Sequence, residues 1–237
     1  MSSVTLDEFV SQLRGALGST LRSVILYGSA VAGEHIARKS DYNVLVIVES
    51  LPLDRLAAIG AVLRAWAEAG NPSPMTFTEA EWKSSADVFP MEYADILERH
   101  QVLFGPDATE GIQVSRGDLR LEVEQQARGK LLHFRRGVMA AGDHGGDQIR
   151  LIEASLSAIM VVFRAVVRLD GDVPSQDYSV LSADVARRAG FDATPFHRAV
   201  EHVRGTTKLR HDDSMGVLAG YMTGMETLVG WLDVFRT

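Results

Sequence analysis

A glycine and a serine, Gly28 and Ser29, directly follow an apolar run that ends at Tyr27. The run is short and rich in β-branched residues, which predicts a strand over 21–27 that ends in a turn. We expect a short helix to begin at Ala30 with its free backbone N–H groups directed back at the turn, an arrangement that favours anions. Glycine lets a phosphate approach the backbone, and serine adds a hydroxyl donor. The pair therefore predicts a phosphate site, with an ordinary turn as the alternative.

A second apolar run, residues 41–48, begins with the polar residues Asp41 and Asn43. Side chains alternate along a strand, so Asp41, Asn43, Leu45 and Ile47 share one face. Both faces are apolar beyond the first residues, which predicts a strand in the interior of a sheet that is covered on both sides. The polar end alone can reach solvent, and it places a carboxylate and an amide oxygen on the same face.

Two adjacent cations, Arg38 and Lys39, lie in the spacer between these motifs. Such a pair could neutralise a triphosphate. A solvated loop explains the two residues equally well, so the sequence leaves both interpretations open.

The order of these motifs resembles a known signature. An apolar strand ending in Gly-Ser, a short spacer, and Asp-x-Asp opening a second strand is the pattern of the nucleotidyltransferase superfamily, which includes aminoglycoside and bacterial minimal nucleotidyltransferases. This chain is similar, with Asn43 in place of the second acid. The segments 87–96 and 102–105 look like the later part of the same catalytic domain in bacterial two-domain members. The resemblance implies that the Gly-Ser pair grips the triphosphate of a nucleoside triphosphate (NTP), and that Asp41 and Asn43 hold magnesium.

The resemblance also implies a third metal-binding acid at the start of a later strand. The candidates are Glu79, Glu92 and Asp95. The periodicity of residues 91–103 is ambiguous, and the resemblance makes at least part of this segment a strand. In a strand, Glu92 and Asp95 would face opposite sides and could not both serve. Asp95 is the preferred candidate, and the alternative is a surface acid paired with Arg99.

Nucleotidyl transfer is an in-line attack of an acceptor hydroxyl on the α-phosphate, with pyrophosphate leaving. Magnesium neutralises the developing charge, so the site needs several carboxylate oxygens around one or two metal ions. Asp41 supplies one charged ligand, whereas Asn43 offers a neutral carbonyl oxygen. The lost charge predicts either a single retained metal with slower or different chemistry, or nucleotide binding without turnover.

The composition excludes several classes of protein. The chain has 237 residues, a formal net charge of −7 and no cysteine. Proteins that coat nucleic acid gain most of their affinity from clustered Lys and Arg, so the negative charge disfavours that role. The lack of cysteine excludes disulfides and thiolate metal sites. No stretch approaches the roughly 20 apolar residues of a membrane span, and Asp7 and Glu8 stand where a signal peptide needs positive charge. We therefore expect a cytoplasmic protein.

Flanking elements predict how the motifs are positioned. Thr5 and Glu8 form a capping-box pattern at the start of an amphipathic helix. The periodicity of residues 52–70 predicts a second helix, which would return the chain to the sheet in parallel. A short strand over 75–78 follows, and Thr78 is a plausible N-cap for the brief helix after it.

The turn signal Gly105-Pro106-Asp107 breaks the pattern and predicts a domain boundary, and after about Val114 the sequence shows helical patterns alone. We expect a nucleotidyltransferase-like domain over 1–113 and a helical bundle domain over 114–237. The predicted fold class is α+β, a mixed β-sheet flanked by helices and followed by an all-α bundle. The helix over 148–169 is apolar nearly all round, which places it at the bundle's centre. Helices are expected at 118–141, 148–169, 182–189, 195–203 and 214–235.

The last of these helices carries a stripe of three glycines, Gly216, Gly220 and Gly224. A glycine costs about 1 kcal/mol inside a helix, so the stripe predicts a backbone packed closely against a neighbour. Such stripes also mark membrane dimers. Glu226 and Asp233 leave too short an apolar run for that, and tight packing in water is favoured.

Four cations crowd the first helix of the predicted bundle. They could face a cleft and hold the nucleotide or an acidic acceptor, or they could form a solvated helix face, which is the favoured interpretation. The four are Arg128, Lys130, Arg135 and Arg136.

Three functions compete. The first is a magnesium-dependent nucleotidyltransferase that places a nucleoside monophosphate (NMP) on the hydroxyl of an unknown small molecule or protein. The second is a degenerate relative that binds nucleotide, or nothing, and acts as a regulatory or interaction module. The third and weakest is an antitoxin-like partner of another protein. Neither the nucleotide base nor the acceptor nor the oligomeric state follows from the sequence.

Overall fold

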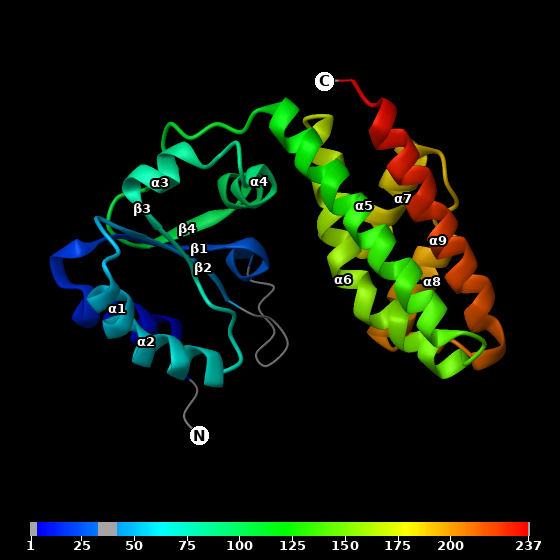
Figure 1. Cartoon of the computed structure of the whole chain (residues 1–237), viewed down its shortest axis with the longest axis horizontal. Coiled ribbons are helices and arrows are strands. Elements are labelled where there is room, and N and C mark those ends of the chain that lie inside the picture. Colours follow the sequence, from blue (N-terminus) through cyan, green and yellow to red (C-terminus); the bar gives the residue numbers. More distant parts are fainter. Residues whose placement is uncertain (1–3, 33–41, 237) are drawn as a thin grey trace. The chain divides into compact units, whose positions relative to one another are not determined.

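The computed structural model describes residues 4–32 and 42–236, without the side chains of Ser29 and Ala32. The chain divides into two compact units, Met1–Ser115 and Arg116–Thr237 (Figure 1). The first unit contains the sheet and the second is helical. The α+β architecture expected from the sequence is therefore confirmed.

A four-stranded mixed sheet with the order β3-β2-β1-β4 forms the centre of the first unit. β1 is antiparallel to both of its neighbours, and β2 and β3 are parallel. The helix α2 (Leu53–Glu68) joins this parallel pair, as the crossover expected from the sequence. The strands are β1 (Leu21–Tyr27), β2 (Asn43–Val48), β3 (Met75–Thr78) and β4 (His100–Phe104).

Helices cover both faces of the sheet, and each face has its own aromatic stack. On one face, Phe9 of α1 (Leu6–Leu17) stacks on Trp66 of α2, with ring centroids 4.0 Å apart. On the other, Trp82 of α3 (Glu79–Ser84) stacks on Tyr93 of α4 (Pro90–Glu98), also at 4.0 Å. The side chains of β2 alternate between these two clusters. The prediction of a strand covered on both sides is confirmed.

Two capping boxes begin helices in this unit. The Thr5 hydroxyl accepts from the N–H of Glu8, whose carboxylate accepts from the N–H of Thr5 in return, as the sequence predicts. Thr78 and Glu81 make the same reciprocal pair at the start of α3. These local hydrogen bonds satisfy N–H groups that have no partner inside the helix.

The ambiguous segment 91–103 contains a helix before its strand, which corrects one inference from the sequence. Pro90 occupies the first turn of α4, where its fixed φ favours a helix and its missing N–H costs nothing. Met91, Tyr93 and Ile96 are buried on this helix. In a helix, residues three apart are neighbours, so Glu92 and Asp95 do not face opposite sides as they would in a strand. Asp95 also lies within α4, and no strand begins there.

Five helices form the second unit, with α6 at its centre. α6 packs against each of the other four. Most of its apolar side chains are buried, as predicted, but Val161 is 44% exposed, so the helix is not apolar all round. Among the described residues, no helix is long and apolar enough to span a membrane. The five are α5 (Arg116–Ala141), α6 (Gly145–Leu169), α7 (Tyr178–Ala189), α8 (Thr194–Arg204) and α9 (His211–Val234).

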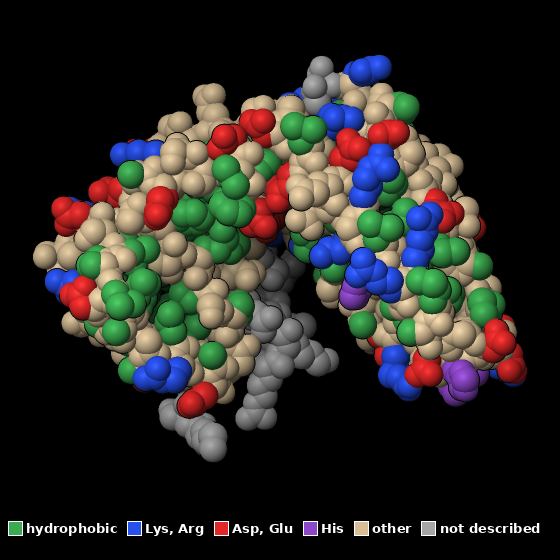
Figure 2. Space-filling model, in the orientation of Figure 1, with side chains coloured by type: hydrophobic (Ala, Val, Ile, Leu, Met, Phe, Trp, Pro, Cys, Tyr) green, Lys and Arg blue, Asp and Glu red, His purple; other side chains and the backbone are tan. Residues whose placement is uncertain are grey.

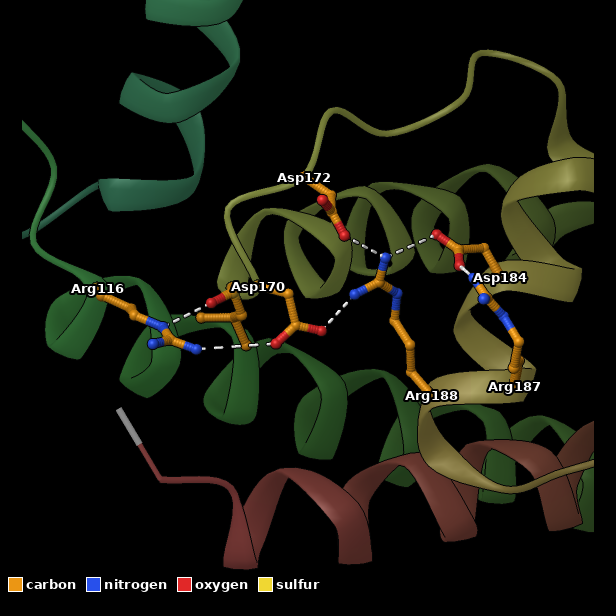
Figure 3. A network of polar contacts seen from close by, with 7 residues as sticks. Arg116, Asp170, Asp172, Asp184, Arg187 and Arg188 are labelled. Carbon is orange, nitrogen blue, oxygen red and sulfur yellow. Dashed lines mark hydrogen bonds and ion pairs between the residues drawn. The ribbon is translucent and has the colours of Figure 1, made fainter.

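A network of three arginines and three aspartates joins the ends of α5, α6 and α7 (Figure 3). Arg188 lies at its centre and pairs with Asp170, with Asp172 at 2.7 Å and with Asp184 at 3.2 Å. Arg116 reaches the same Asp170 from α5. The three positive charges equal the three negative charges in number. Because the ion pairs link residues from different helices, we interpret the network as a structural connection between those helices.

Two of the four cations on α5 form ion pairs with α9. Arg128 lies 2.6 Å from a carboxylate oxygen of Asp233, and Arg135 lies 2.7 Å from one of Glu226. Figure 2 shows both cationic and anionic side chains on this unit. These two arginines therefore help to hold the bundle together.

The glycine stripe of α9 is tightly packed at two of its three positions. A Cβ at Gly220 would lie 2.5 Å from the Pro195 ring, and one at Gly224 would lie 2.6 Å from the Phe196 ring. Gly216 has open space beside it. Close packing therefore explains Gly220 and Gly224, whereas Gly216 is an exposed helix position.

Alanine substitution should separate these two kinds of glycine. Gly216→Ala should raise the free energy of unfolding by about 0.5–1 kcal/mol, because it only improves helix propensity. Gly220→Ala should lower it by about 1–3 kcal/mol, because the new methyl group overlaps a proline ring. Urea unfolding of the full chain, followed by circular dichroism, measures both. Equal effects from the two substitutions would contradict the packing described for α9.

Candidate functional site

The polar motifs meet where β1 ends and β2 begins. Tyr27 pairs with Asn43 on one side and with His100 on the other. Gly28 follows with φ at +78°, a backbone conformation that glycine adopts without strain. A Cβ at Gly28 would lie 3.3 Å from Nδ2 of Asn43. The glycine of the first motif and the amide of the second are thus direct neighbours.

The turn itself differs from the helix expected after it. A 3₁₀-helix spans Gly28–Ala32, so it begins at the glycine and not at Ala30. The Gly28 N–H donates to the Arg99 carbonyl at 3.3 Å, because the pairing of β1 with β4 continues past the strand. One donor of the predicted phosphate site is therefore already used in the sheet.

Several predicted site residues lie outside the described residues. They are Arg38, Lys39 and Asp41. The side chain of Ser29 is likewise outside that part. Their assignments to phosphate and metal stay predictions.

Tyr27 and Asn43 face α4. Residues directly opposite in an antiparallel pair put their side chains on the same face. Two positions further along each strand, Ile25 and Leu45 pack into the cluster that contains Tyr93 of α4. The alternation of side chains therefore directs Tyr27 and Asn43 to that same face.

Two carboxylates of α4, Glu92 and Asp95, lie near Tyr27. Burial, together with the charges of Asp95 and Glu92, raises the pKa of the Tyr27 phenol to about 12. The two acids are three residues apart on one helix and share a side. The structure thus brings Asp95, the preferred third acid, together with Glu92 beside Tyr27.

Glu92 is the residue that sequence reasoning did not select. Burial raises the pKa of its carboxyl, the backbone N–H of Glu92 itself lowers it, and the charge of Asp95 raises it. One oxygen, Oε2, is buried without a hydrogen-bond partner among the described residues. Its spacing from Asp95, together with a helix start at Pro90, was the signal that could have identified it.

The remaining sequence candidate, Glu79, does not join this group, and neither does His100, which was not a sequence candidate. Glu79 lies 3.6 Å from Arg22, at the opposite end of β1, beside a cavity of about 220 Å³. His100 begins β4, but its ring nitrogens contact the Ile96 carbonyl and Asp107. Both side chains are thus held in local polar contacts.

The donors gathered here suit a hard cation. Carboxylate and amide oxygens are the ligands that magnesium prefers. Within the described ranges, no three His, Cys, Asp or Glu side chains could together hold a metal ion. Glu92, Asp95 and Asn43 would supply two carboxylates and one amide, and the buried Oε2 of Glu92 is available to a cation because no hydrogen bond among the described residues uses it.

Comparison with known proteins shows a likeness of fold. No family model matches the chain, and no curated protein matches it in sequence. Among solved structures, the chain is similar to spectinomycin adenyltransferase AAD(9) from Enterococcus faecialis, crystallised with ATP and spectinomycin. The TM-score is 0.60 at 13% identity, over 95% of this chain and 98% of that one. The chain therefore shares its fold with this adenyltransferase over nearly the whole length of both chains.

Gly28 can be tested against a matched glycine, Gly111. Both have positive φ in the first unit, but only Gly28 has a close neighbour, Asn43. Replacing either by alanine should cost roughly 1–2 kcal/mol of folding free energy, because an L-residue is strained there. Gly28→Ala should also displace the Asn43 amide, which nuclear magnetic resonance of the labelled side chain detects. An unmoved Asn43 signal would contradict the contact.

Proposed function

We propose that the protein is a nucleotidyltransferase that transfers NMP from an NTP to a hydroxyl group of an acceptor. The observation that carries the proposal is that Gly28 and Asn43 are neighbours beside Tyr27, the residue on which the charges of Asp95 and Glu92 of α4 act. These residues lie in a fold shared with an adenyltransferase crystallised with ATP. ATP is therefore the first nucleotide to test, and hydroxyl-bearing small molecules are the first acceptors.

In the proposed reaction, the acceptor oxygen attacks the α-phosphorus as the bond to the β-phosphate oxygen breaks. Pyrophosphate leaves, and the hydroxyl proton passes to a basic group or to solvent. Gly28 would let the triphosphate approach the backbone, Ser29 would donate a hydrogen bond, and Arg38 and Lys39 would neutralise phosphate charge.

The metal-binding residues of this proposal are Asp41, Asn43 and Asp95. A bound magnesium ion would neutralise the charge that develops on the phosphate oxygens. Asp41 precedes Asn43 by two residues in the sequence, and Asn43 pairs with Tyr27 on the face of the sheet that α4 covers. Asp95 already lies near that face, beside Tyr27.

Nucleotide binding without turnover is the second candidate function. The observation that favours it is Asn43, whose neutral amide stands where the resemblance implies an acid. The hydrogen bond from the Gly28 N–H to the Arg99 carbonyl also favours this second candidate, because it leaves one fewer N–H group to bind phosphate.

Calorimetric titration with ATP, GTP, CTP and UTP, with and without magnesium, tests the proposal. We expect magnesium-dependent binding of at least one nucleotide and its loss in Asp41→Ala, because that substitution removes a charged metal ligand. Asp54→Ala, which removes an exposed acid at the start of α2, is the matched control and should bind as the wild type does.

Release of pyrophosphate in the presence of candidate acceptors then separates the two functions. Release that requires both an acceptor and Asp41 supports the transferase. Binding without release supports the second candidate, and failure to bind any of the four nucleotides would overturn both.

A further inference from the structure

We propose that Glu92 is a ligand of the divalent cation and supplies the carboxylate that Asn43 lacks. This inference rests on the proposed function, since the nucleotidyltransferase fold is what implies a metal. It adds a residue of α4 to a site whose other acids, Asp41 and Asp95, were assigned from the sequence pattern.

The first argument is the state of the Glu92 carboxylate. Burial raises the pKa of the Glu92 carboxyl, and the hydrogen bond from the backbone N–H of Glu92 opposes that rise without cancelling it. Oε2 is buried and has no hydrogen-bond partner among the described residues. A buried polar atom without a partner costs about 1–3 kcal/mol, and more when the group is charged. A cation at Oε2 would remove that cost.

The second argument is position. Tyr27 is the residue common to both parts of the site, because it pairs directly with Asn43 and its phenol is affected by the charges of Glu92 and Asp95. Glu92 and Asp95 project from one side of α4. A cation between the helix and the end of β2 would meet an amide oxygen from the strand and carboxylates from the helix.

The third argument is charge. An Asp-x-Asp pair with a third acid brings three negative charges to the metal. With Asn43 neutral, Asp41 and Asp95 bring two, and Glu92 restores the third. The negative charge that is lost with asparagine at position 43 is thus replaced by the charge of Glu92, so the cation would still meet three negative charges.

A purely structural explanation accounts for less. Glu92 is the third residue of α4, and an acid in the first turn of a helix interacts favourably with the helix dipole. An exposed carboxylate would achieve the same interaction. The dipole therefore does not explain why Oε2 is buried without a partner.

Manganese titration of the full chain without nucleotide, followed by the electron paramagnetic resonance signal of free Mn²⁺, tests the proposal. Wild-type protein should bind Mn²⁺, and Glu92→Gln should weaken binding by at least about tenfold, the scale of losses when the surroundings of a metal are altered. Glutamine keeps the shape of the side chain, so the melting temperature should not fall. Glu79→Gln, at the opposite end of β1, is the matched control and should bind as the wild type does.

A second variant keeps the test decisive if Glu92→Gln alone folds poorly. Asn43→Asp should bind Mn²⁺ more tightly than the wild type, and Asn43→Asp combined with Glu92→Gln should return to near wild-type affinity. Equal affinity in the wild type and in Glu92→Gln, no Mn²⁺ binding by the wild type, or no loss in the double variant relative to Asn43→Asp would overturn the proposal. Mn²⁺ binding that depends on Glu92, without nucleotide turnover, would reject the proposed transferase and leave this cation site standing.

Discussion

The burial of β2 on both faces is the constraint on which the first unit depends. Alternate side chains of this strand enter two separate clusters, one under α1 and α2 and the other under α3 and α4. A slip of one residue in the pairing with β1 would exchange the two faces. Because both faces are apolar, polarity alone would not oppose that slip. The shapes of the clusters do, since each is built around its own stacked aromatic pair, Phe9 with Trp66 and Trp82 with Tyr93.

The place of the candidate site follows from this register. With Ile25 opposite Leu45, the next pair on the same face is Tyr27 and Asn43. Among the described residues, the cluster under α3 and α4 has no member beyond that pair on either strand. At this point, polar groups can therefore lie next to the sheet on the α4 face without interrupting its core. α4 covers the same face and adds Glu92 and Asp95 through its first two turns. The core thus determines which helix can contribute to the site.

Elements with strong local signals were predictable from the sequence. The strands β1 and β3, the capping box at Thr5, the N-cap at Thr78 and the central helix α6 depend on patterns that a few neighbouring residues determine. α4 was not predictable in this way, because its segment fits neither period clearly and the resemblance favoured a strand. That single ambiguity changed the predicted set of site residues, because Glu92 and Asp95 point to opposite sides of a strand but to the same side of a helix.

Other features depend on contacts between distant parts of the chain, and no local pattern reveals them. The Gly28 N–H donates a hydrogen bond to the carbonyl of Arg99, which is more than seventy residues away along the sequence. Gly216 and Gly220 belong to the same four-residue repeat of glycines in α9, but Pro195 of α8 packs only against Gly220. The pairing of Arg128 and Arg135 with α9 is of the same kind. In each case the sequence identified the residue, and the tertiary partner decided its role.

The neutral residue at position 43 also has a consequence for the folded protein without a cation. Like charges that share a partly buried site raise each other's pKa and oppose folding. Glu92 already shows this effect, because the charge of Asp95 adds to burial in raising the pKa of the Glu92 carboxyl. An aspartate at position 43 would add another negative charge at the same end of the sheet. The amide keeps an oxygen there without that repulsion, so Asn43 lets the first unit bury a carboxylate on α4 that a second acid on β2 would make more costly.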